Sequence, residues 1–259
     1  MSRQRRVPGR VLKVTEHTRV ALVTGAAHGI GQAITHALVR DGLVVAGVDV
    51  DEEALAAVAA AHPERFRGYR TDVSDPDDVA RMFVELEAEL QHVDVLVNNA
   101  GTCFMTEFTE ISAEELHRQM AINFDGAFYC CQHAVRLMLA RPGVKKIVNI
   151  SSNGAYNFDV FDPAHYRASK AALDNLTKHL SRRYAADRIA VNSIAPAMTR
   201  TRLFDVVDDG VLAEAVAAMP HGSPLDPAEV ADWVAFLVSP AGDCASGNVI
   251  ILNQGRDVR

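Results

Sequence analysis

The stretch "VALVTGAAHGIGQAI" (20–34) joins a short apolar run to a helical pattern through a glycine-rich turn. Gly25, Gly29 and Gly31 allow the backbone to turn tightly and to approach a ligand closely. The N–H groups and the positive dipole end at the start of the helix attract an anion. Three glycines in this position, directly after an expected strand, predict a site for the pyrophosphate of a dinucleotide.

The rest of the chain repeats this alternation of short apolar runs and helical patterns. Several runs are rich in valine and isoleucine without polar alternation, which is typical of strands buried on both faces of a parallel sheet. The expected strands are 19–24, 43–49, 65–71 (the weakest), 93–99, 145–151, 188–195 and 248–253, and the expected helices are 29–41, 52–61, 75–91, 112–140 and 167–185. The pattern predicts an α/β fold, a doubly wound parallel β-sheet of about seven strands flanked by helices.

One domain is expected over residues 18–259, because no linker, repeat or low-complexity tract divides the chain. The basic residues 1–17 are expected to form a flexible, solvated arm. The long irregular region 197–226 begins just beyond an expected strand end, which is a common place for a substrate lid. A net charge of −7 argues against a nucleic-acid surface, and no apolar run reaches the ~18 residues of a membrane helix.

The four cysteines, Cys103, Cys130, Cys131 and Cys244, follow no zinc-ligand spacing, and no metal site is predicted. Two of them are adjacent within the expected helix 112–140. Buried or partly buried thiols in the reducing cytoplasm are the expected state of all four.

Asp49 ends the second expected strand, 18 residues after Gly31. A carboxylate in this position accepts both hydrogen bonds of an adenosine ribose diol and repels a 2′-phosphate, so it favours NAD over NADP. Alternatively, Asp49 caps the next helix, although Asp51 is better placed for that role. His28, inside the glycine turn, is no fixed positive charge that would reverse the preference.

The stretch "AHYRASKAAL" (164–173) places Tyr166 and Lys170 one helical turn apart on the same face. A tyrosine with its ordinary pKa near 10 is a poor base at neutral pH. An ammonium group within a few ångströms favours the phenolate and lowers that pKa. The pair is therefore suited to move a proton to or from an alcohol oxygen.

Taken in order, these motifs resemble those of the classical short-chain dehydrogenase/reductase family over residues 18–255. The matching positions are the turn Thr24-Gly25-Ala26-Ala27-His28-Gly29-Ile30-Gly31, the "NNAG" at 98–101, Asn123 in "MAINFDGAF", Ser152 after the fifth expected strand, and Tyr166-x-x-x-Lys170. The resemblance implies a Rossmann-type fold and a catalytic set of Asn123, Ser152, Tyr166 and Lys170. Ser152 would bond the substrate oxygen, and Asn123 would hold a water that connects Lys170 to solvent. The interval from Ser152 to Tyr166 is one residue longer than is commonest, so Ser151 remains an alternative.

The resemblance also implies a nicotinamide dinucleotide cofactor. Asp72 and Val73 match the pair that touches adenine, and the segment after 195 lies where the family closes over the nicotinamide and pyrophosphate. The expected cofactor contacts are Gly25, His28, Gly29, Ile30, Gly31, Asp49, Asp72, Val73, Asn99, Ala100, Gly101, Tyr166, Lys170, Pro196, Met198, Thr199 and Thr201. A homo-oligomer, dimer or tetramer, is expected, because the family pairs the helices 112–140 and 167–185 between subunits.

The loop before Tyr166 contributes the aromatic residues Tyr156, Phe158 and Phe161. Their rings either form the wall of a pocket for an apolar or aromatic ketone or pack against one another. His165 is expected to be solvated or bonded to backbone rather than to act as a second acid.

Arg200 and Arg202 allow two interpretations as well: they clamp a carboxylate or phosphate of the substrate, or they form a solvated face of the lid. Trp233 lies within the amphipathic pattern "AEVADWVAFLVSP" (228–240) and is expected in the core.

The sequence therefore predicts a cytoplasmic, NAD-dependent oxidoreductase that interconverts a secondary alcohol and a ketone by hydride transfer. Its expected partner is a small-molecule substrate, not a nucleic acid or a membrane. Three alternatives stay open: an NADPH-dependent 3-oxoacyl thioester reductase, a sugar or polyol dehydrogenase, and a non-catalytic nucleotide-sensing regulator. Asp49 counts against the first, and a regulator has little need of Ser152, Tyr166 and Lys170 together.

Overall fold

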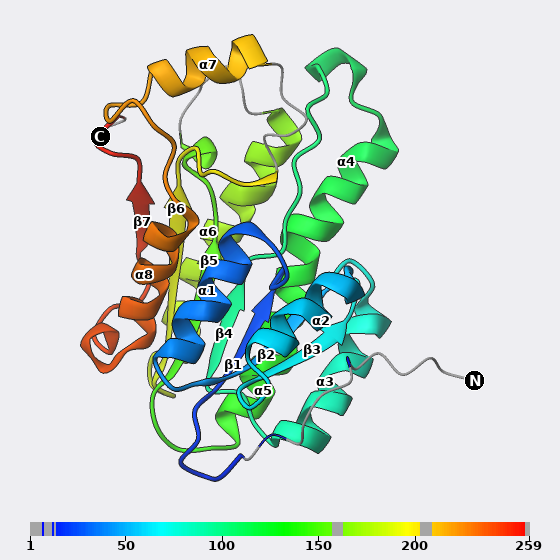
Figure 1. Ribbon diagram of the computed structural model, residues 1–259, viewed down its shortest axis with the longest axis vertical. Helices are drawn as coiled ribbons and strands as arrows, with labels where there is room; N and C mark the ends of the chain where they lie inside the picture. The colour runs from blue at the N-terminus through cyan, green and yellow to red at the C-terminus, as the bar shows by residue number, and fades with distance from the viewer. Residues whose placement is uncertain (1–6, 8–11, 13, 157–162, 203–208, 257–259) are drawn as a thin grey trace.

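The computed structural model in Figure 1 describes residues 7, 12, 14–156, 163–202 and 209–256. A central sheet has the strand order β3-β2-β1-β4-β5-β6-β7, and all neighbouring strands are parallel. The strands are β1 (Val20–Thr24), β2 (Val44–Asp49), β3 (Phe66–Arg70), β4 (Val95–Asn98), β5 (Lys145–Ile150), β6 (Ile189–Pro196) and β7 (Val249–Leu252). Every predicted strand is confirmed, including the weakest, and the order is that of a doubly wound, Rossmann-type sheet.

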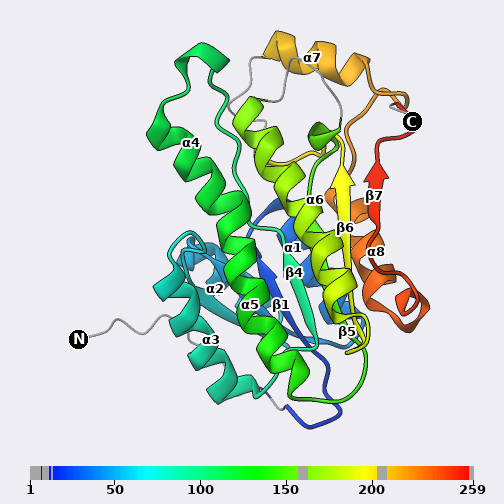
Figure 2. The same cartoon turned by 180° about the vertical axis from the view of Figure 1, so that it is seen from behind.

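Helices cover both faces of this sheet (Figures 1 and 2). One face carries α1 (Gly29–Arg40), α2 (Glu52–Ala61) and α8 (Pro227–Val238), and the other carries α3 (Pro76–Leu90), α4 (Ala113–Met120), α5 (Gly126–Leu139) and α6 (Ala164–Tyr184). The predicted helix 112–140 consists of α4 and α5, which a π-helical turn, Ala121–Asp125, joins. α7 (Asp209–Ala217) lies beyond the carboxyl ends of the strands.

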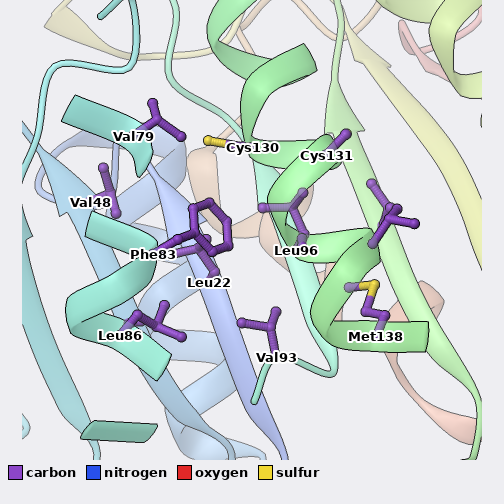
Figure 3. Close-up of a cluster of buried hydrophobic side chains, with 14 of the residues drawn as sticks. Leu22, Val48, Val79, Phe83, Leu86, Val93, Leu96, Cys130, Cys131 and Met138 are labelled. Atoms are coloured by element: carbon purple, nitrogen blue, oxygen red, sulfur yellow. The ribbon is translucent and has the colours of Figure 1, made fainter. Parts of the chain in front are cut away.

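An apolar layer fills the space between the sheet and each helical face. On one side, Phe83 of α3 and Met138 of α5 belong to a buried cluster with Leu22 of β1 (Figure 3). On the other side, Ile34 of α1 and Val234 of α8 belong to a second buried cluster. The sheet is thus buried on both faces, which explains why its strands lack polar alternation.

The cysteines differ in their surroundings. Cys103, Cys130 and Cys131 are buried as predicted, and Cys130 and Cys131 lie in the layer beneath α5 (Figure 3). Burial raises the pKa of the Cys131 thiol to about 12, so this group is protonated at neutral pH. Cys244 is exposed, contrary to the prediction, because it lies in the loop before β7, outside both apolar layers.

Helix capping explains where α3 begins. Asp75 is the cap, because its side chain accepts hydrogen bonds from the N–H groups of Asp77 and Asp78. Pro76 occupies the first turn, where its missing N–H has no consequence.

The prediction that Trp233 lies in the core is wrong, since 42% of this residue is exposed. α8 buries Val230, Val234 and Leu237 instead, and these positions share one side of the helix. Trp233 and Phe236 occupy the outer side, with their ring centroids 6.2 Å apart.

Two described residues of the N-terminal segment differ from the predicted solvated arm. Val7 and Leu12 are both buried. The N–H of Val7 donates to the carbonyl of Gly68 at 2.9 Å, so Val7 bonds the edge strand β3. Within the described residues, no helix has the length and apolar character that crossing a bilayer requires.

Candidate active site

A cavity of about 580 Å³ opens at the carboxyl ends of the strands. The sheet order reverses between β1 and β4, and this is where open α/β sheets bind ligands. The cavity wall contains Ser152 and every predicted cofactor contact except Gly31. Gly31 and Asn123 are both buried and lie behind the wall.

The glycine turn leaves room for a ligand. Gly25 and Gly29 have φ angles of +64° and +49°, which other residues rarely adopt. A Cβ on Gly31 would collide with the carbonyl oxygen of Gly25, so Gly31 lets the start of α1 pack against the turn. His28 precedes α1 without capping it through its side chain. The first N–H groups of α1 thus have no cap from the His28 side chain, and Gly29 and Ile30 at the start of the helix are part of the cavity wall. Such a helix start is suited to bind an anion.

Asn99 and Thr24 hold the glycine turn against the end of β4. The Nδ2 of Asn99 donates to the carbonyls of Thr24 (3.0 Å) and Gly25 (3.1 Å). In return, the Thr24 Oγ1 accepts from the N–H groups of Asn99 and Ala100, both at 3.0 Å. Sequence reasoning overlooked this role of Thr24, although a polar residue at the end of a buried strand was the available signal.

Asp49 connects the glycine turn to the residue that caps α2. Its carboxylate accepts from the N–H groups of Ala27 and Asp51, each at 3.1 Å. Asp51 caps α2 by accepting from the N–H of Ala54 at 3.0 Å. The alternative that Asp49 is the helix cap is therefore wrong, and its side chain is part of the cavity wall.

Tyr166 and Lys170 occupy the first two turns of α6 and are both buried. The Lys170 Nζ is 5.9 Å from the centre of the Tyr166 ring and donates to the carbonyl of Ile150 at 2.8 Å. Burial lowers the pKa of Lys170 to about 8, while the negative charge of Asp174 opposes this decrease. A lysine in this state is cationic at neutral pH and close to titration.

The two serines after β5 have different surroundings. The Ser151 Oγ donates to Asp174 at 2.9 Å and is buried. The Ser152 Oγ accepts from the N–H of Gly154 at 3.0 Å and caps a short 3-10 turn, Asn153–Ala155. Because its hydroxyl hydrogen does not bond Asp174, Ser152 is the better placed of the two to meet a substrate.

Asp174 joins three segments beneath this site, a role that sequence reasoning missed. Its carboxylate accepts from the hydroxyls of Ser151 (2.9 Å), Tyr156 (2.7 Å) and Ser193 (2.6 Å). These hydroxyls come from the end of β5, the loop after it, and β6. The signal was the spacing, since Asp174 follows Lys170 by one helical turn on the same face.

Asn123 connects the loop after β4 to α6 from within the π-helical turn. Its Oδ1 accepts from the N–H of Thr102 at 2.8 Å, and its Nδ2 donates to the carbonyl of Thr102 (2.9 Å) and to the Ser169 Oγ (3.0 Å). A Cβ on Gly101 would lie 3.4 Å from the Asn123 Oδ1 and 3.3 Å from the Lys170 Nζ, so these groups meet around one glycine. The predicted water at Asn123 stays a prediction.

The segment after β6 closes one side of the cavity. Met198, Thr199 and Thr201 form part of the wall, and Thr199 pairs with Leu225 in a short parallel bridge. A Cβ on Gly29 would lie 3.1 Å from the Thr201 Cγ2, so this segment contacts the glycine turn. Residues 203–208 of the predicted lid lie outside the described residues.

His165 and Tyr156 both differ from their expected roles. His165 is buried, and its Nε2 lies 3.1 Å from the Glu115 Oε1. The prediction that His165 is solvated or bonded to backbone is therefore wrong. Tyr156 bonds Asp174 and is absent from the described cavity wall. Phe158 and Phe161 lie outside the described residues.

Several wall residues belong to no motif, and the sequence carried no signal for them. The cavity wall also contains Cys103, Met105, Arg118, Ile122, Ala215 and Arg256. These residues come from the loop after β4, from α4, from the π-helical turn, from α7 and from the turn after β7, so only the folded chain brings them together.

Comparison with known proteins agrees with this geometry. A family model described as "Enoyl-(Acyl carrier protein) reductase" matches residues 25–257. The chain is 37% identical to the cis-4-hydroxycyclohexanecarboxylate dehydrogenase of Sinomonas cyclohexanicum, over 92% of its own length and 96% of the relative's. It is 30% identical to the NAD-dependent glycerol dehydrogenase of Listeria innocua, over 93% and 94% of the two chains. The crystal structure of a short-chain dehydrogenase/reductase from Brucella melitensis, described as a glucose/ribitol dehydrogenase, matches with a TM-score of 0.87 and 31% identity, over 95% of this chain and 100% of that one.

The sheet, the glycine turn and the cavity wall define a nicotinamide-dependent oxidoreductase that acts on hydroxyl groups. The chain belongs to the classical short-chain dehydrogenase/reductase family, as its motifs predicted.

Proposed function

We propose that the protein interconverts a secondary alcohol and a ketone with NAD, and that Ser152, Tyr166 and Lys170 carry out the proton transfer. The observation that carries the proposal is a buried lysine beside a buried tyrosine in the wall of the cavity. Burying a lysine costs free energy, since burial disfavours its charged form. We infer that the positive charge of Lys170 has a function at this place, which is to lower the pKa of Tyr166.

Bound NAD supplies the hydride acceptor for oxidation, and NADH the donor for reduction. Tyr166 takes the proton from the alcohol during oxidation and returns it to the ketone oxygen during reduction. The ammonium of Lys170 stabilises the phenolate, and Ser152 bonds the substrate oxygen as charge develops there. Asn123 positions the loop after β4 against α6 and, in this proposal, holds the water that links Lys170 to solvent.

Residues at both ends of the cavity support the proposal that the cofactor is NAD. The positive-φ glycines Gly25 and Gly29 leave space that side chains would fill, at the start of a helix suited to a pyrophosphate. Asp72 and Val73 line the part proposed for adenine. Asp49 lines the part proposed for the ribose, where its charge disfavours the 2′-phosphate of NADP. The NAD dependence of the Listeria innocua relative supports the same choice.

Replacement of Asp49 tests the cofactor preference. In Asp49→Ser, the ratio of kcat/KM with NAD to kcat/KM with NADP is expected to fall roughly 10- to 100-fold, because a charge-assisted hydrogen bond to the ribose and a repulsion against the 2′-phosphate are both lost. Steady-state kinetics with each cofactor measure the ratio. Asp41→Asn, which removes a carboxylate near the end of α1 and outside the cavity wall, is the control. An unchanged ratio in Asp49→Ser would exclude Asp49 from ribose recognition.

Further features of the proposal concern the surroundings of the site. Residues 197–226 serve as the substrate lid of a single domain over residues 18–259, and residues 1–17 form an N-terminal arm of which Val7 and Leu12 are buried against that domain. The substrate is a small molecule, and the exposed Phe128 and Leu139 of α5 support a homo-oligomer, dimer or tetramer, formed through α5 and α6. Four free thiols support a reducing, cytoplasmic location.

The first experiment is a spectrophotometric assay of NADH or NADPH formation. Cyclic secondary alcohols, acyclic polyols and 3-hydroxyacyl thioesters are each tested with NAD and with NADP. Turnover of a secondary alcohol with NAD is the expected result, with ring alcohols favoured because the Sinomonas cyclohexanicum relative is named for one. Turnover confined to the thioesters with NADP would favour the 3-oxoacyl thioester reductase instead. Intact cofactor binding without any turnover would favour a nucleotide-sensing regulator.

A further inference from the structure

The glycine turn supplies no fixed positive charge of its own, because residues 24–31 contain neither lysine nor arginine. The carboxylates of the described cavity wall, Asp49 and Asp72, follow β2 and β3 on this side of the sheet. A pyrophosphate carries two negative charges, and neighbouring carboxylates disfavour its binding. A cation that reaches the turn from another part of the chain would therefore favour a dinucleotide.

Arg202 brings such a charge from the segment after β6. It is part of the same cavity wall as the glycine turn, and its Nη1 lies 3.3 Å from the Nε2 of His28. His28 is the residue that precedes α1. The neighbouring Thr201 approaches the same place, since a Cβ on Gly29 would lie 3.1 Å from the Thr201 Cγ2. The guanidinium of Arg202 is thus placed at the start of α1.

The His28 nitrogen that Arg202 approaches is already bonded, because it lies 2.8 Å from the Asp51 Oδ2. Hydrogen bonds from the N–H of Ala54 and from His28 hold the pKa of Asp51 below its ordinary value. The Asp51 carboxylate is therefore ionised at neutral pH and can only accept, so the His28 Nε2 carries a hydrogen. A guanidinium can only donate. The contact between Arg202 and His28 is therefore not a hydrogen bond while His28 bonds Asp51.

The positive charge of Arg202 has room for a closer acceptor. Among the residues that the structure describes, no carboxylate lies within ion-pair distance of Arg202, and its charge acts on Asp51 only at longer range. Two N–H donors that face each other repel, and an anion between them relieves this repulsion. A phosphate group accepts parallel hydrogen bonds from a guanidinium and further ones from the N–H groups of a helix start.

We propose that Arg202 is a cofactor-binding residue, whose guanidinium contacts the pyrophosphate of NAD at the start of α1. This inference rests on the proposed function, because it requires a dinucleotide in the cavity. The fixed charge that the glycine turn lacks then comes from the first residues of the proposed lid, 197–226. The same contact holds this end of the lid against the turn while the cofactor is bound.

The sequence suggested Arg200 and Arg202 together, either as a clamp for an anionic group of the substrate or as a solvated face of the lid. Arg200 is exposed and absent from the described cavity wall, and its N–H donates to the carbonyl of Leu225 at 2.9 Å. Its position agrees with the solvated face. Arg202 lies beside the glycine turn, where the expected anion belongs to the cofactor rather than to the substrate.

Calorimetry tests the contact without any turnover. NAD, ADP-ribose and adenosine are each titrated into the wild-type protein and its variants. Arg202→Gln is expected to raise the Kd of NAD and of ADP-ribose roughly 10- to 100-fold, because a charge-assisted hydrogen bond is lost. The Kd of adenosine, which has no phosphate, is expected to stay within about twofold. Arg202→Lys keeps the charge without the planar fork and is expected to be intermediate.

Arg200→Gln is the matched control two residues away and is expected to bind all three ligands as the wild type does. Because Arg202 is exposed, its replacement by Gln is expected to leave Tm unchanged, which thermal unfolding measures. An equal loss of affinity for adenosine would overturn the inference, since the damage would then extend beyond the phosphates.

Titration with NADP and 2′-AMP separates the two phosphate positions of the cofactor. If Arg202→Gln weakened these ligands but not NAD, Arg202 would serve the 2′-phosphate and the inference would be overturned. Unchanged affinity for every ligand would also overturn it and would leave the proposed function intact. A loss of NAD affinity in Arg202→Gln, for a protein that oxidises no alcohol, would support the inference and contradict the proposed function alone.

Discussion

Phenylalanine in place of Tyr166 is expected to lower kcat about 10²- to 10⁴-fold, because the substrate oxygen loses its proton donor and acceptor. The ring stays in its place on α6, so packing beside Lys170 is retained. Cofactor affinity is therefore expected to stay within about twofold of the wild type, since the variant removes a group that acts on the reacting oxygen. Steady-state kinetics give kcat, and calorimetry gives the Kd of NAD.

The chain offers a matched control on the same helix. Tyr184 ends α6, packs against the core and stacks with Arg183 at 5.0 Å, and it is not part of the described cavity wall. Tyr184→Phe removes the same hydroxyl group without approaching Lys170 and is expected to keep full activity. If Tyr166→Phe kept more than about a tenth of the wild-type kcat, Tyr166 would not be the proton-transfer group.

The sequence predicted those parts of the fold and of the site that depend on neighbours along the chain. The glycine turn, Asp49 at the end of β2 and the Tyr166–Lys170 pair each use residues within one or two adjacent elements. Their geometry follows from helix and strand periodicity. The spacing argument even distinguished Asp51 as the cap of α2.

Features that depend on segments far apart in the sequence were not predicted. Arg118 and Arg256 line the same cavity, and they follow β4 and β7, which lie on either side of β5 and β6. No local sequence pattern reveals this strand order. Trp233 was assigned to the core because it lies in an amphipathic apolar pattern, although α8 has more apolar positions than the sheet side can bury. The exposed Cys244 was missed for a related reason, since cysteine composition indicates redox state but not position.

The buried charges of the site depend on each other. Lys170 needs a nearby negative charge to remain cationic in a buried place, and Asp174 is the largest influence that opposes the effect of burial on its pKa. Asp174 in turn accepts three hydroxyl donors, which satisfy a carboxylate that is almost fully buried. One residue thus supports both the protonation state of Lys170 and the position of the serine loop.

Replacement of Asp174 separates these two effects. Asp174→Leu leaves the hydroxyls of Ser151, Tyr156 and Ser193 without their shared acceptor, at an expected cost of about 3–5 kcal/mol in the free energy of unfolding. For a chain of this length, that cost corresponds to a fall in Tm of roughly 10 °C. Asp174→Asn keeps an acceptor and is expected to lower Tm much less. Thermal unfolding followed by circular dichroism measures both variants.

The asparagine variant also predicts the direction of a pH effect. Loss of the negative charge disfavours the ammonium of Lys170, so its pKa, which is about 8 in the wild type, falls further. Lys170 then loses its proton at a lower pH, and the alkaline decline of kcat/KM for ketone reduction is expected to move to lower pH. Asp232→Asn, which removes an exposed carboxylate on α8, is the control and should leave the profile unchanged. A shift of the profile to higher pH in Asp174→Asn, or no shift, would contradict the proposed coupling between Asp174 and Lys170. The loss of stability in Asp174→Leu together with the shift to lower pH in Asp174→Asn would identify Asp174 as the residue that holds Lys170 in its reactive state.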